Sequence, residues 1–361
     1  MWTDRRLLEL LDLDHPIIQA PMAGASTPAM AAAAANAGCL GSLGCAMMTP
    51  EDYRADFQAL RDGTNRRVNM NFFCHKPPED DPAANRRAVD RLAPLYDEAG
   101  IEKMPDVRPT HFPYGAEMHA EIMETRPGVV SFHFGLPEER FVEELKADGA
   151  LILCSATTAE EARDLENRGV DVIIAQGWEA GGHQGFYLRD QPSQIGTMAL
   201  VPAVVDAVDV PVVAAGGIAD GRGIVAALAL GAAGVQIGTA FLTTKETGSP
   251  DAHRKVLLDA DGADTRMTRA FSGRPARGVV NRYMDYMEQM EDTLPEFPLM
   301  NTLTGPLRKA GASAGSPDML SLWSGQAVGL NKAGTVAGTI DRLVGETRDV
   351  LANLPAVPDA G

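Results

Sequence analysis

Short apolar runs alternate with helical patterns along the first two thirds of the chain. The runs are near-continuously apolar, which is typical of strands covered by helices on both faces and hence of a parallel sheet. We expect strands at Ile17–Met22, Cys39–Leu43, Val68–Phe73, Val129–Phe134, Ala150–Ser155, Val170–Ala175, Val210–Ala215 and Gly234–Gly238. Helical patterns occur at Pro28–Ala37, Pro50–Arg61, Asn85–Glu98, Glu138–Ala147, Ala159–Arg168, Val201–Val208 and Gly223–Leu230.

Eight strand–helix repeats within about 240 residues predict an α/β fold of the (β/α)8 TIM-barrel type, which typically takes about 250 residues. A doubly wound open sheet is the alternative. The first predicted strand is not followed by the G-x-G-x-x-G spacing of a Rossmann dinucleotide site, and Gly38, Gly41 and Gly44 do not match it. The barrel is therefore the favoured fold.

The pattern changes after Phe241, where the chain becomes polar and rich in methionine. We expect a barrel domain over residues 1–241 and a smaller helical domain over residues 242–314, placed above the barrel mouth. Helices are expected there at Ala252–Asp259 and Arg282–Glu291. Residues 315–361 would form a closing loop and, at Val336–Leu354, the last barrel helix. The smaller domain would thus be inserted before that helix.

Charge and cysteine content narrow the possible functions. The 361-residue chain has a net charge of −17 and no Lys/Arg cluster, so neither nucleic acid nor an anionic membrane surface is an expected partner. Its four cysteines show no CxxC spacing, and we expect no metal site. The N-terminus lacks the plan of a signal peptide, which makes the cytoplasm the expected location. The sequence does not predict an oligomeric state.

The segment Gln176–Gly185, QGWEAGGHQG, directly follows the sixth predicted strand. Barrel enzymes place their chemistry at this carboxyl end of the strands. Gly181 and Gly182 remove two Cβ atoms, so that a flat ligand can lie on the backbone. His183 offers the one side chain here that changes charge near neutral pH. A surface turn with a solvated histidine is the plainer interpretation.

Two glycine-rich turns end the last two strands, at Gly216-Gly217 and at Gln236–Thr239, which contains Ile237 and Gly238. Loops at this position in barrels often bind a phosphate through backbone N–H groups, helped by a helix N-terminus. We expect the helix that begins near Gly223 to supply that positive end. Ordinary turns are the alternative, and the phosphate could belong to a substrate or to FMN.

The other strand ends favour FMN. Small and apolar residues follow the first strand at Ala20, Pro21, Met22, Ala23 and Gly24, which suits a flat ring. Asn71 and Gln176 end the third and sixth strands and offer amides to ring carbonyls or nitrogens. His133 lies on the fourth strand as a candidate substrate contact or a satisfied core histidine. This combination suits a flavin mononucleotide that carries the chemistry.

The chain resembles the nitronate monooxygenases, once called 2-nitropropane dioxygenases, and their bacterial class I branch in particular. The resemblance rests on IIQAPMAGASTPAM, VNMNFF, AQGWEAGGHQG, PVVAAGGIADGRG, GVQIGTAFL and LWSGQAVGL, and it spans nearly the whole chain. It implies a TIM barrel with a helical substrate-binding domain and non-covalent FMN. It further implies that Asn71, Gln176 and Gly181 contact the flavin, and that Gly217 and Gln236–Thr239 hold its phosphate. Met22–Gly24 and the segment containing Trp323, Gly325 and Gln326 would complete the pocket.

The resemblance implies oxidation of alkyl nitronates such as propionate 3-nitronate by O2, giving a carbonyl compound and nitrite. His183 would be the active-site histidine, acting as a base on neutral nitroalkanes or orienting an anionic nitronate. One alternative is an FMN-dependent NAD(P)H reductase of a quinone or an enoyl thioester. Two others are a flavin-free barrel aldolase or isomerase and a non-catalytic flavin-binding protein.

Overall fold

The computed structural model describes residues 2–79 and 81–354. The end of the third predicted domain, residues 355–361, lies outside the described residues.

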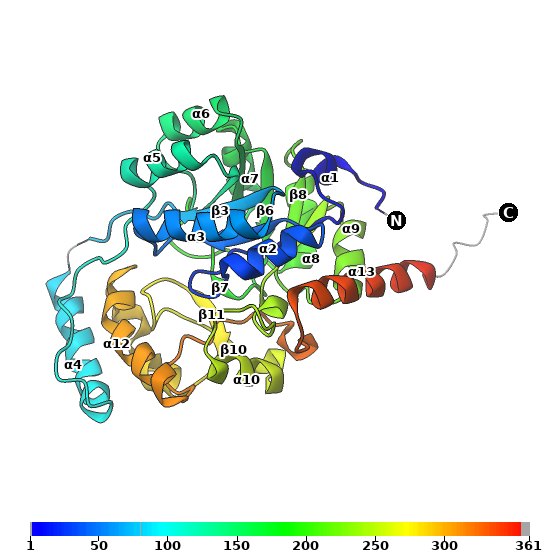
Figure 1. The fold of residues 1–361 in the computed structure, drawn as a ribbon. Helices are drawn as coiled ribbons and strands as arrows, with labels where there is room; N and C mark the ends of the chain where they lie inside the picture. Colours follow the sequence, from blue (N-terminus) through cyan, green and yellow to red (C-terminus); the bar gives the residue numbers. More distant parts are fainter. Residues whose placement is uncertain (1, 80, 355–361) are drawn as a thin grey trace.

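Eight parallel strands form the main sheet, in the order β1-β9-β8-β6-β5-β4-β3-β2. A parallel bridge between Ile18 and Leu40 joins the two ends of this order, so that the sheet closes into a barrel (Figure 1). The strands are β1 Ile17–Gln19, β2 Gly41–Gly44, β3 Val68–Phe73, β4 Gly128–His133, β5 Leu151–Ala156, β6 Val172–Gln176, β8 Val212–Ala215 and β9 Gly234–Ile237. Each lies within or overlaps a predicted run, and the predicted TIM barrel is confirmed.

Helices connect the strands and cover the outside of the barrel. They are α2 Pro28–Asn36, α3 Pro50–Gly63, α5 Ala116–Thr125, α6 Glu139–Ala147, α7 Ala159–Asn167, α8 Thr197–Val205, α9 Gly221–Ala229 and α13 Val336–Ala352. Local sequence explains where several begin. At α3 the Thr49 side chain accepts from the backbone of Asp52, the Asp52 carboxylate accepts from the backbone of Thr49, and Pro50 fits the first turn.

The first helix, α1 Arg6–Leu11, closes the amino-terminal end of the barrel. Its buried side chains Leu7 and Leu11 pack with Ile18, Val129 and other apolar residues near the beginnings of the strands. This leaves the carboxyl ends of the strands as the open end, where barrel enzymes build their sites.

A smaller lobe covers that open end (Figure 1). It contains a three-stranded antiparallel sheet in the order β10-β11-β7, in which β7 comes from the loop after β6. Its elements are β7 Gly182–His183, α10 Asp251–Asp259, η2 Gly262–Asp264, β10 Thr265–Thr268, β11 Ala276–Val279, α11 Arg282–Met287, η3 Glu288–Thr293 and α12 Leu299–Ala314. The helices expected at 252–259 and 282–291 are present, whereas the strands and α12 are additional to the prediction.

The long helix α4 Pro82–Glu98 packs on this lobe. Its buried Leu92 and Tyr96 share a core with Phe271, Tyr283 and Leu303. The predicted domain boundary at residue 241 assigns α4 to the barrel domain. Its apolar side chains, however, belong to the core of the smaller lobe. Residues 328–330 form the short helix η4 before the chain returns to the barrel as α13.

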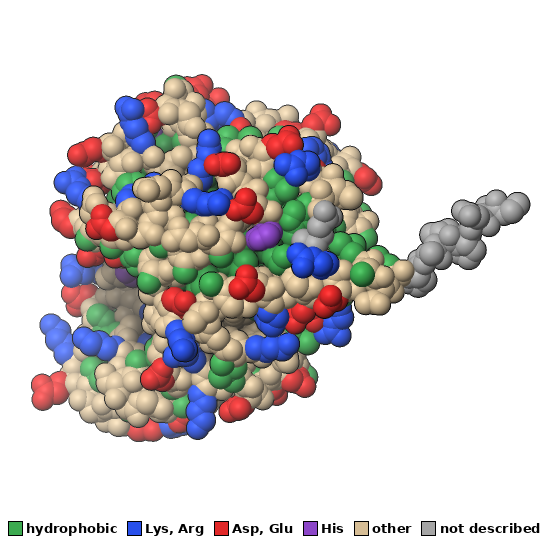
Figure 2. Space-filling model, turned by 45° about the vertical axis from the view of Figure 1, so that its right-hand side comes forward, with side chains coloured by type: hydrophobic (Ala, Val, Ile, Leu, Met, Phe, Trp, Pro, Cys, Tyr) green, Lys and Arg blue, Asp and Glu red, His purple; other side chains and the backbone are tan. Residues whose placement is uncertain are grey.

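Acidic and basic side chains are interspersed over the face drawn in Figure 2. Within the described part of the chain, no helix combines the length and the apolar character needed to cross a membrane.

Candidate active site

A cavity of about 430 Å³ lies between the carboxyl ends of the barrel strands and the smaller lobe. Residues at or after the ends of β1, β3, β4, β6, β8 and β9 line it on the barrel side. On the other side it is lined by α12 and by residues of the segments 297–301 and 320–327. The cavity therefore occupies the position at which barrel enzymes bind their ligands.

The structure brings nearly all of the predicted site residues together around this cavity. Those that line it are Ala20, Pro21, Met22, Ala23, Gly24, Asn71, His133, Gln176, Gly181, Gly182, His183, Gly216, Gly217, Gln236, Gly238, Thr239, Trp323 and Gly325. Two predicted residues do not line it. Ile237 packs in the outer core of the barrel because successive side chains of a strand point to opposite faces, and Gln236 takes the inner one. The Gln326 side chain is exposed, and its backbone N–H donates to the Glu179 carbonyl at 2.9 Å.

His183 lies in β7 inside a group of aromatic side chains. The centroid of its ring is 5.5 Å from that of Phe297, 5.6 Å from that of Trp323 and 6.0 Å from that of Phe73. Its Nε2 atom lies 2.8 Å from the Ser272 hydroxyl oxygen. This hydroxyl is also within reach of the Arg274 carbonyl, at 3.2 Å, so Ser272 can donate its proton to either partner. The direction of that proton selects the tautomer of His183.

Burial keeps the His183 imidazole uncharged. Loss of hydration lowers its pKa to about 3, and the nearby His133 and Arg274 act in the same direction. At neutral pH the ring therefore has one N–H donor and one free lone pair. It can accept a proton or donate a hydrogen bond without first losing a charge.

His133 and Gln176 hold the backbone of His183 in place. The His183 carbonyl accepts from His133 Nε2 at 3.1 Å and from Gln176 Nε2 at 2.9 Å. A carbonyl only accepts, so His133 carries its proton on Nε2 and its Nδ1 accepts from the Ser155 hydroxyl at 2.6 Å. Gln176 also accepts from the Gly185 N–H at 2.7 Å. Both ring nitrogens of His133 are thus engaged within the protein, which favours the satisfied histidine over a substrate contact.

Asn71 and Gln236 keep acceptor capacity toward the cavity. Asn71 donates to the Ser131 hydroxyl at 2.9 Å, and this leaves its carbonyl oxygen without a partner among the described residues. The Gln236 carbonyl oxygen is buried and has no hydrogen-bond partner there either. A buried acceptor without a donor is costly, so a ligand with N–H or O–H groups would be stabilised at this point.

The turns after β8 and β9 leave room for an anion. Gly216 and Gly217 have φ values of 107° and 73°, which favour glycine, and a Cβ at position 216 would lie 2.9 Å from the Ala180 nitrogen. Within the described chain, the N–H groups of Gly217, Gly238 and Thr239 donate to no protein acceptor. Such free amides at the ends of two adjacent strands suit a phosphate group.

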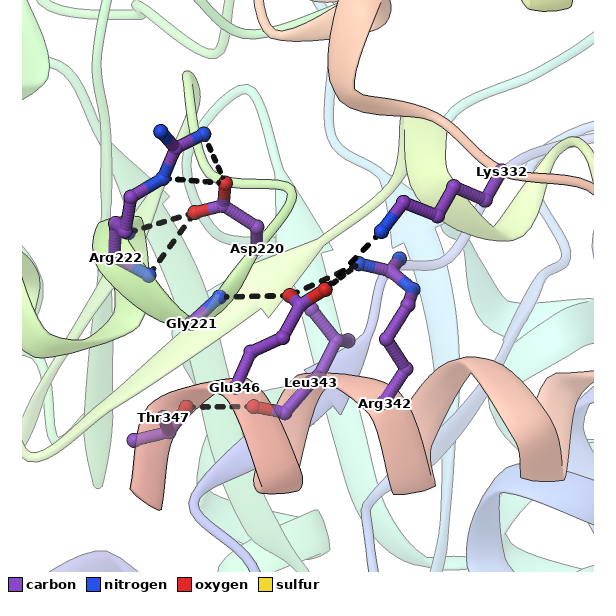
Figure 3. Close-up of polar contacts among 9 residues, drawn as sticks. Asp220, Gly221, Arg222, Lys332, Arg342, Leu343, Glu346 and Thr347 are labelled. Atoms are coloured by element: carbon purple, nitrogen blue, oxygen red, sulfur yellow. Dashed lines mark hydrogen bonds and ion pairs between the residues drawn. The ribbon is translucent and has the colours of Figure 1, made fainter. Parts of the chain in front are cut away.

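The prediction that the N-terminus of the helix after β8, α9, helps to bind the phosphate is wrong. At the start of α9 the Gly221 N–H donates to the Glu346 carboxylate at 3.2 Å, and the Asp220 carboxylate accepts from the amides of Arg222 and Gly223 (Figure 3). These amides are already satisfied, and two carboxylates occupy the positive end of the helix. Any phosphate here would be bound by the turns alone.

The closing segment 323–327 packs directly on the His183 loop. A Cβ on Gly181 would lie 2.5 Å from the Gly325 nitrogen, and the Gly325 N–H donates to the Thr239 hydroxyl at 3.0 Å. Glycine is required at 181 because two backbone segments meet there. Glu179, two residues before Gly181 in this loop, caps α8 by accepting from the Thr197 N–H at 2.8 Å. Its carboxylate is thus engaged at the helix and does not line the cavity.

Sequence reasoning missed several residues that shape the site. Phe73, Phe297 and Ser272 surround His183, and Asn301 and Arg308 line the cavity from α12. Phe73 could have been predicted from the sequence, because it lies in the same predicted strand as Asn71. The others come from the smaller lobe, whose sequence has no motif that places it over the barrel.

Comparisons with known proteins agree on one family. The family model described as nitronate monooxygenase matches residues 4–346. A nitronate monooxygenase from Pseudomonas aeruginosa is 42% identical over 349 residues, covering 95% of this chain and 99% of that protein. A probable nitronate monooxygenase from Staphylococcus aureus is 37% identical, covering 90% of this chain and 92% of that protein.

Two solved structures match almost the whole chain. The nitroalkane oxidase from Streptomyces ansochromogenes has a TM-score of 0.89 at 38% identity, covering 97% of this chain and 100% of that one. FabK from Thermotoga maritima has a TM-score of 0.76 at 28% identity, covering 96% of this chain and 97% of that one.

Among the described residues, no group of three or more His, Cys, Asp or Glu side chains is arranged to hold a metal ion.

Proposed function

Because this chain belongs to the nitronate monooxygenase family, a family of flavin-dependent oxidoreductases, we propose that its cavity binds FMN and that it oxidises alkyl nitronates with O2. The products would be a carbonyl compound and nitrite. The observation that carries this proposal is the position of His183, whose ring lines the same cavity as the glycine turns after β8 and β9.

The cavity fits FMN in size and chemistry. Its volume lies in the range of about 300–1,000 Å³ usual for small-molecule sites. The free amides of Gly217, Gly238 and Thr239 would hold the phosphate, and the unpaired oxygens of Asn71 and Gln236 would accept from ring or ribityl donors. Ala20–Gly24 would lie against the ring. FMN would supply the capacity to accept electrons from the substrate.

The residues of this chain would bind and orient the nitronate. The aromatic side chains around His183 would exclude water, and loss of water strengthens polar contacts inside the cavity. When Ser272 donates to His183 Nε2, the imidazole proton is on Nδ1, which can then donate to a nitronate oxygen. When Ser272 donates to the Arg274 carbonyl, Nδ1 has a lone pair that can accept a proton from a neutral nitroalkane.

Two measurements test the proposal. The purified protein should be yellow, and acid-released flavin should comigrate with FMN. Propionate 3-nitronate should drive O2 consumption together with nitrite release. A colourless protein that FMN does not reconstitute would favour a flavin-free barrel enzyme, and a yellow protein inert to every reductant would be a non-catalytic flavin-binding protein.

A cytoplasmic location, testable by cell fractionation, stays a prediction.

The likeness to FabK supports a second candidate, an FMN-dependent NAD(P)H reductase of a quinone or an enoyl thioester. Anaerobic stopped-flow mixing separates the two. Nitronate oxidation requires that a nitronate bleach the flavin rapidly, whereas bleaching by NADH or NADPH alone would favour the reductase.

A further inference from the structure

A neutral nitroalkane gives up one proton in each turnover. Its oxidation by O2 to a carbonyl compound and the nitrite anion releases a proton, whereas oxidation of the nitronate anion to the same products releases none. When His183 takes this proton from the substrate carbon, it must pass the proton on before it can act again. The reaction with neutral substrates therefore needs a route from His183 to solvent.

The route does not run through the residues that hold His183. Ser272 is buried, its hydroxyl lies 2.8 Å from His183 Nε2, and its other partner is the Arg274 carbonyl at 3.2 Å. A peptide carbonyl accepts a hydrogen bond but does not carry a proton away. His133 donates to the His183 carbonyl and not to its imidazole. The proton therefore leaves through Nδ1 of His183 and the cavity that this ring lines.

A second histidine, His75, lies beside the aromatic group that surrounds His183. It follows β3 by two residues, is 6% exposed and lines the cavity. The centroid of its ring is 4.7 Å from that of Phe297, and the Phe297 centroid is 5.5 Å from that of His183. The two imidazoles are therefore no more than about 10 Å apart, a gap that a short chain of hydrogen-bonded water can bridge.

His75 takes no part in the hydrogen bonding of the fold. Among the described residues neither of its ring nitrogens has a partner, and Nδ1 is fully buried, so Nε2 is the nitrogen that the cavity can reach. By contrast His133, His183 and His253, which line the same cavity, each have a partner in the chain. A buried polar group without a partner is costly. Water or a proton in the cavity would supply the missing contact.

The proton affinities favour transfer from His183 to His75. Burial lowers the pKa of His183 to about 3 and that of His75 to about 4, the latter with a contribution from the charges of Arg274 and His111. A proton on His183 is therefore more stable on His75, and at neutral pH it is more stable again in water. His111 is half-buried and lines the same cavity, so His75 lies near a group with access to solvent.

We propose that His75 is a proton carrier, whose Nε2 accepts through cavity water the proton that His183 has taken from a neutral nitroalkane and then releases it to solvent. Only N–H and O–H bonds form and break in this transfer, and the released proton balances the charge of the nitrite anion. The inference rests on the proposed function and on His183 as the base.

The test compares nitroethane with preformed ethyl nitronate in the FMN-loaded enzyme. H75Q should lower kcat for nitroethane at least about tenfold, because the proton then leaves without a carrier. Its kcat/KM for nitroethane should change less than about threefold, since proton release follows the capture of the substrate. Turnover of ethyl nitronate, which releases no proton, should also change less than about threefold. H15Q, at the opposite end of the barrel, should match the wild type on both substrates.

Chemical rescue separates a proton carrier from a structural residue. H75A leaves a space in the cavity wall, so added imidazole should restore most of the lost kcat for nitroethane. In calorimetry, imidazole should bind FMN-loaded H75A at least tenfold more tightly than the wild type.

Several results would overturn the proposal. They are an unchanged kcat for nitroethane in H75Q, equal losses on both substrates, and an H75A variant that imidazole neither binds nor rescues. A wild type that oxidises ethyl nitronate but not nitroethane would overturn it too, because no proton would then have to leave. A wild type that oxidises neither substrate would instead refute the proposed function.

Discussion

Replacing His183 with asparagine removes the imidazole that faces the proposed substrate but keeps a polar side chain of similar size. If His183 acts as a base, only substrates that must lose a proton need it. A neutral nitroalkane needs that step, and an anionic nitronate does not. The variant should therefore affect the two substrate forms very differently.

The environment of His183 sets the size of the effect. Lowering its pKa from 6.5 to about 3 disfavours the charged ring by about 5 kcal/mol, so the imidazole is available as a base but a weak one. General-base catalysis typically contributes about 10²–10⁴-fold. We expect H183N to lower kcat/KM for nitroethane at least about 100-fold and for ethyl nitronate less than about tenfold.

The pH dependence follows from the same shift. Because the folded pKa lies below 6.5, the neutral base persists as pH falls and is lost only near pH 3. Wild-type kcat/KM for nitroethane should show no decline attributable to His183 between pH 8 and pH 5.

The assay is O2 consumption with freshly dissolved neutral nitroethane and, separately, with preformed ethyl nitronate. H15N is the matched control, because His15 precedes β1 at the opposite end of the barrel. Equal losses on both substrates in H183N would refute the base role and favour an orienting one. A nitroethane profile that falls with a midpoint near 6.5 would contradict the buried, uncharged imidazole.

Two further predictions concern the phosphate cradle and acid stability. In G217A, alanine at a φ of 73° is strained by about 1–2 kcal/mol, and the free turn can relieve this strain by leaving that conformation. Restoring the conformation when the phosphate binds should weaken FMN binding about 5- to 30-fold, measured by flavin fluorescence. G345A on α13, where a Cβ meets open space, should not weaken it. Histidines with lowered pKa values bind protons more readily when unfolded, so stability should fall from pH 6.5 toward pH 4. At pH 5 the urea-unfolding free energy should be lower by about 2 kcal/mol for each histidine with a folded pKa of about 4, namely His75, His133 and His253. A stability that stays flat from pH 7 to 5 would contradict these shifts.

The barrel was predictable because each strand is buried on both faces and is therefore apolar almost throughout. The same logic located the cavity, because residues that follow such strands meet at one end of a barrel. His183 and the turns at 216–217 and 238–239 were found in this way, and the structure brings them to one cavity.

The smaller lobe was harder to predict because its elements are short and partly polar. β10 and β11 have four residues each, and β7 has two, so none produces a periodic pattern. Their pairing depends on the loop after β6 meeting a segment nearly a hundred residues later, which local pattern does not encode. The same contact explains why Ser272 and Phe297 were missed.

The side chains that cap the N-terminus of α9 could not be predicted from the sequence. A glycine-rich turn before a helix predicted an open N-terminus, but Asp220 and the distant Glu346 on α13 satisfy its amides. No pattern near residue 221 signals a partner that is 125 positions away.

Anaerobic titration of the purified protein with propionate 3-nitronate, followed by visible absorption, tests the central claim most directly. A flavin bound at the turns after β8 and β9, with its ring toward His183, predicts a yellow protein whose visible flavin absorption is lost on mixing and returns with air. A colourless protein, or a yellow one that nitronate leaves unchanged while NADH bleaches it, would contradict that claim.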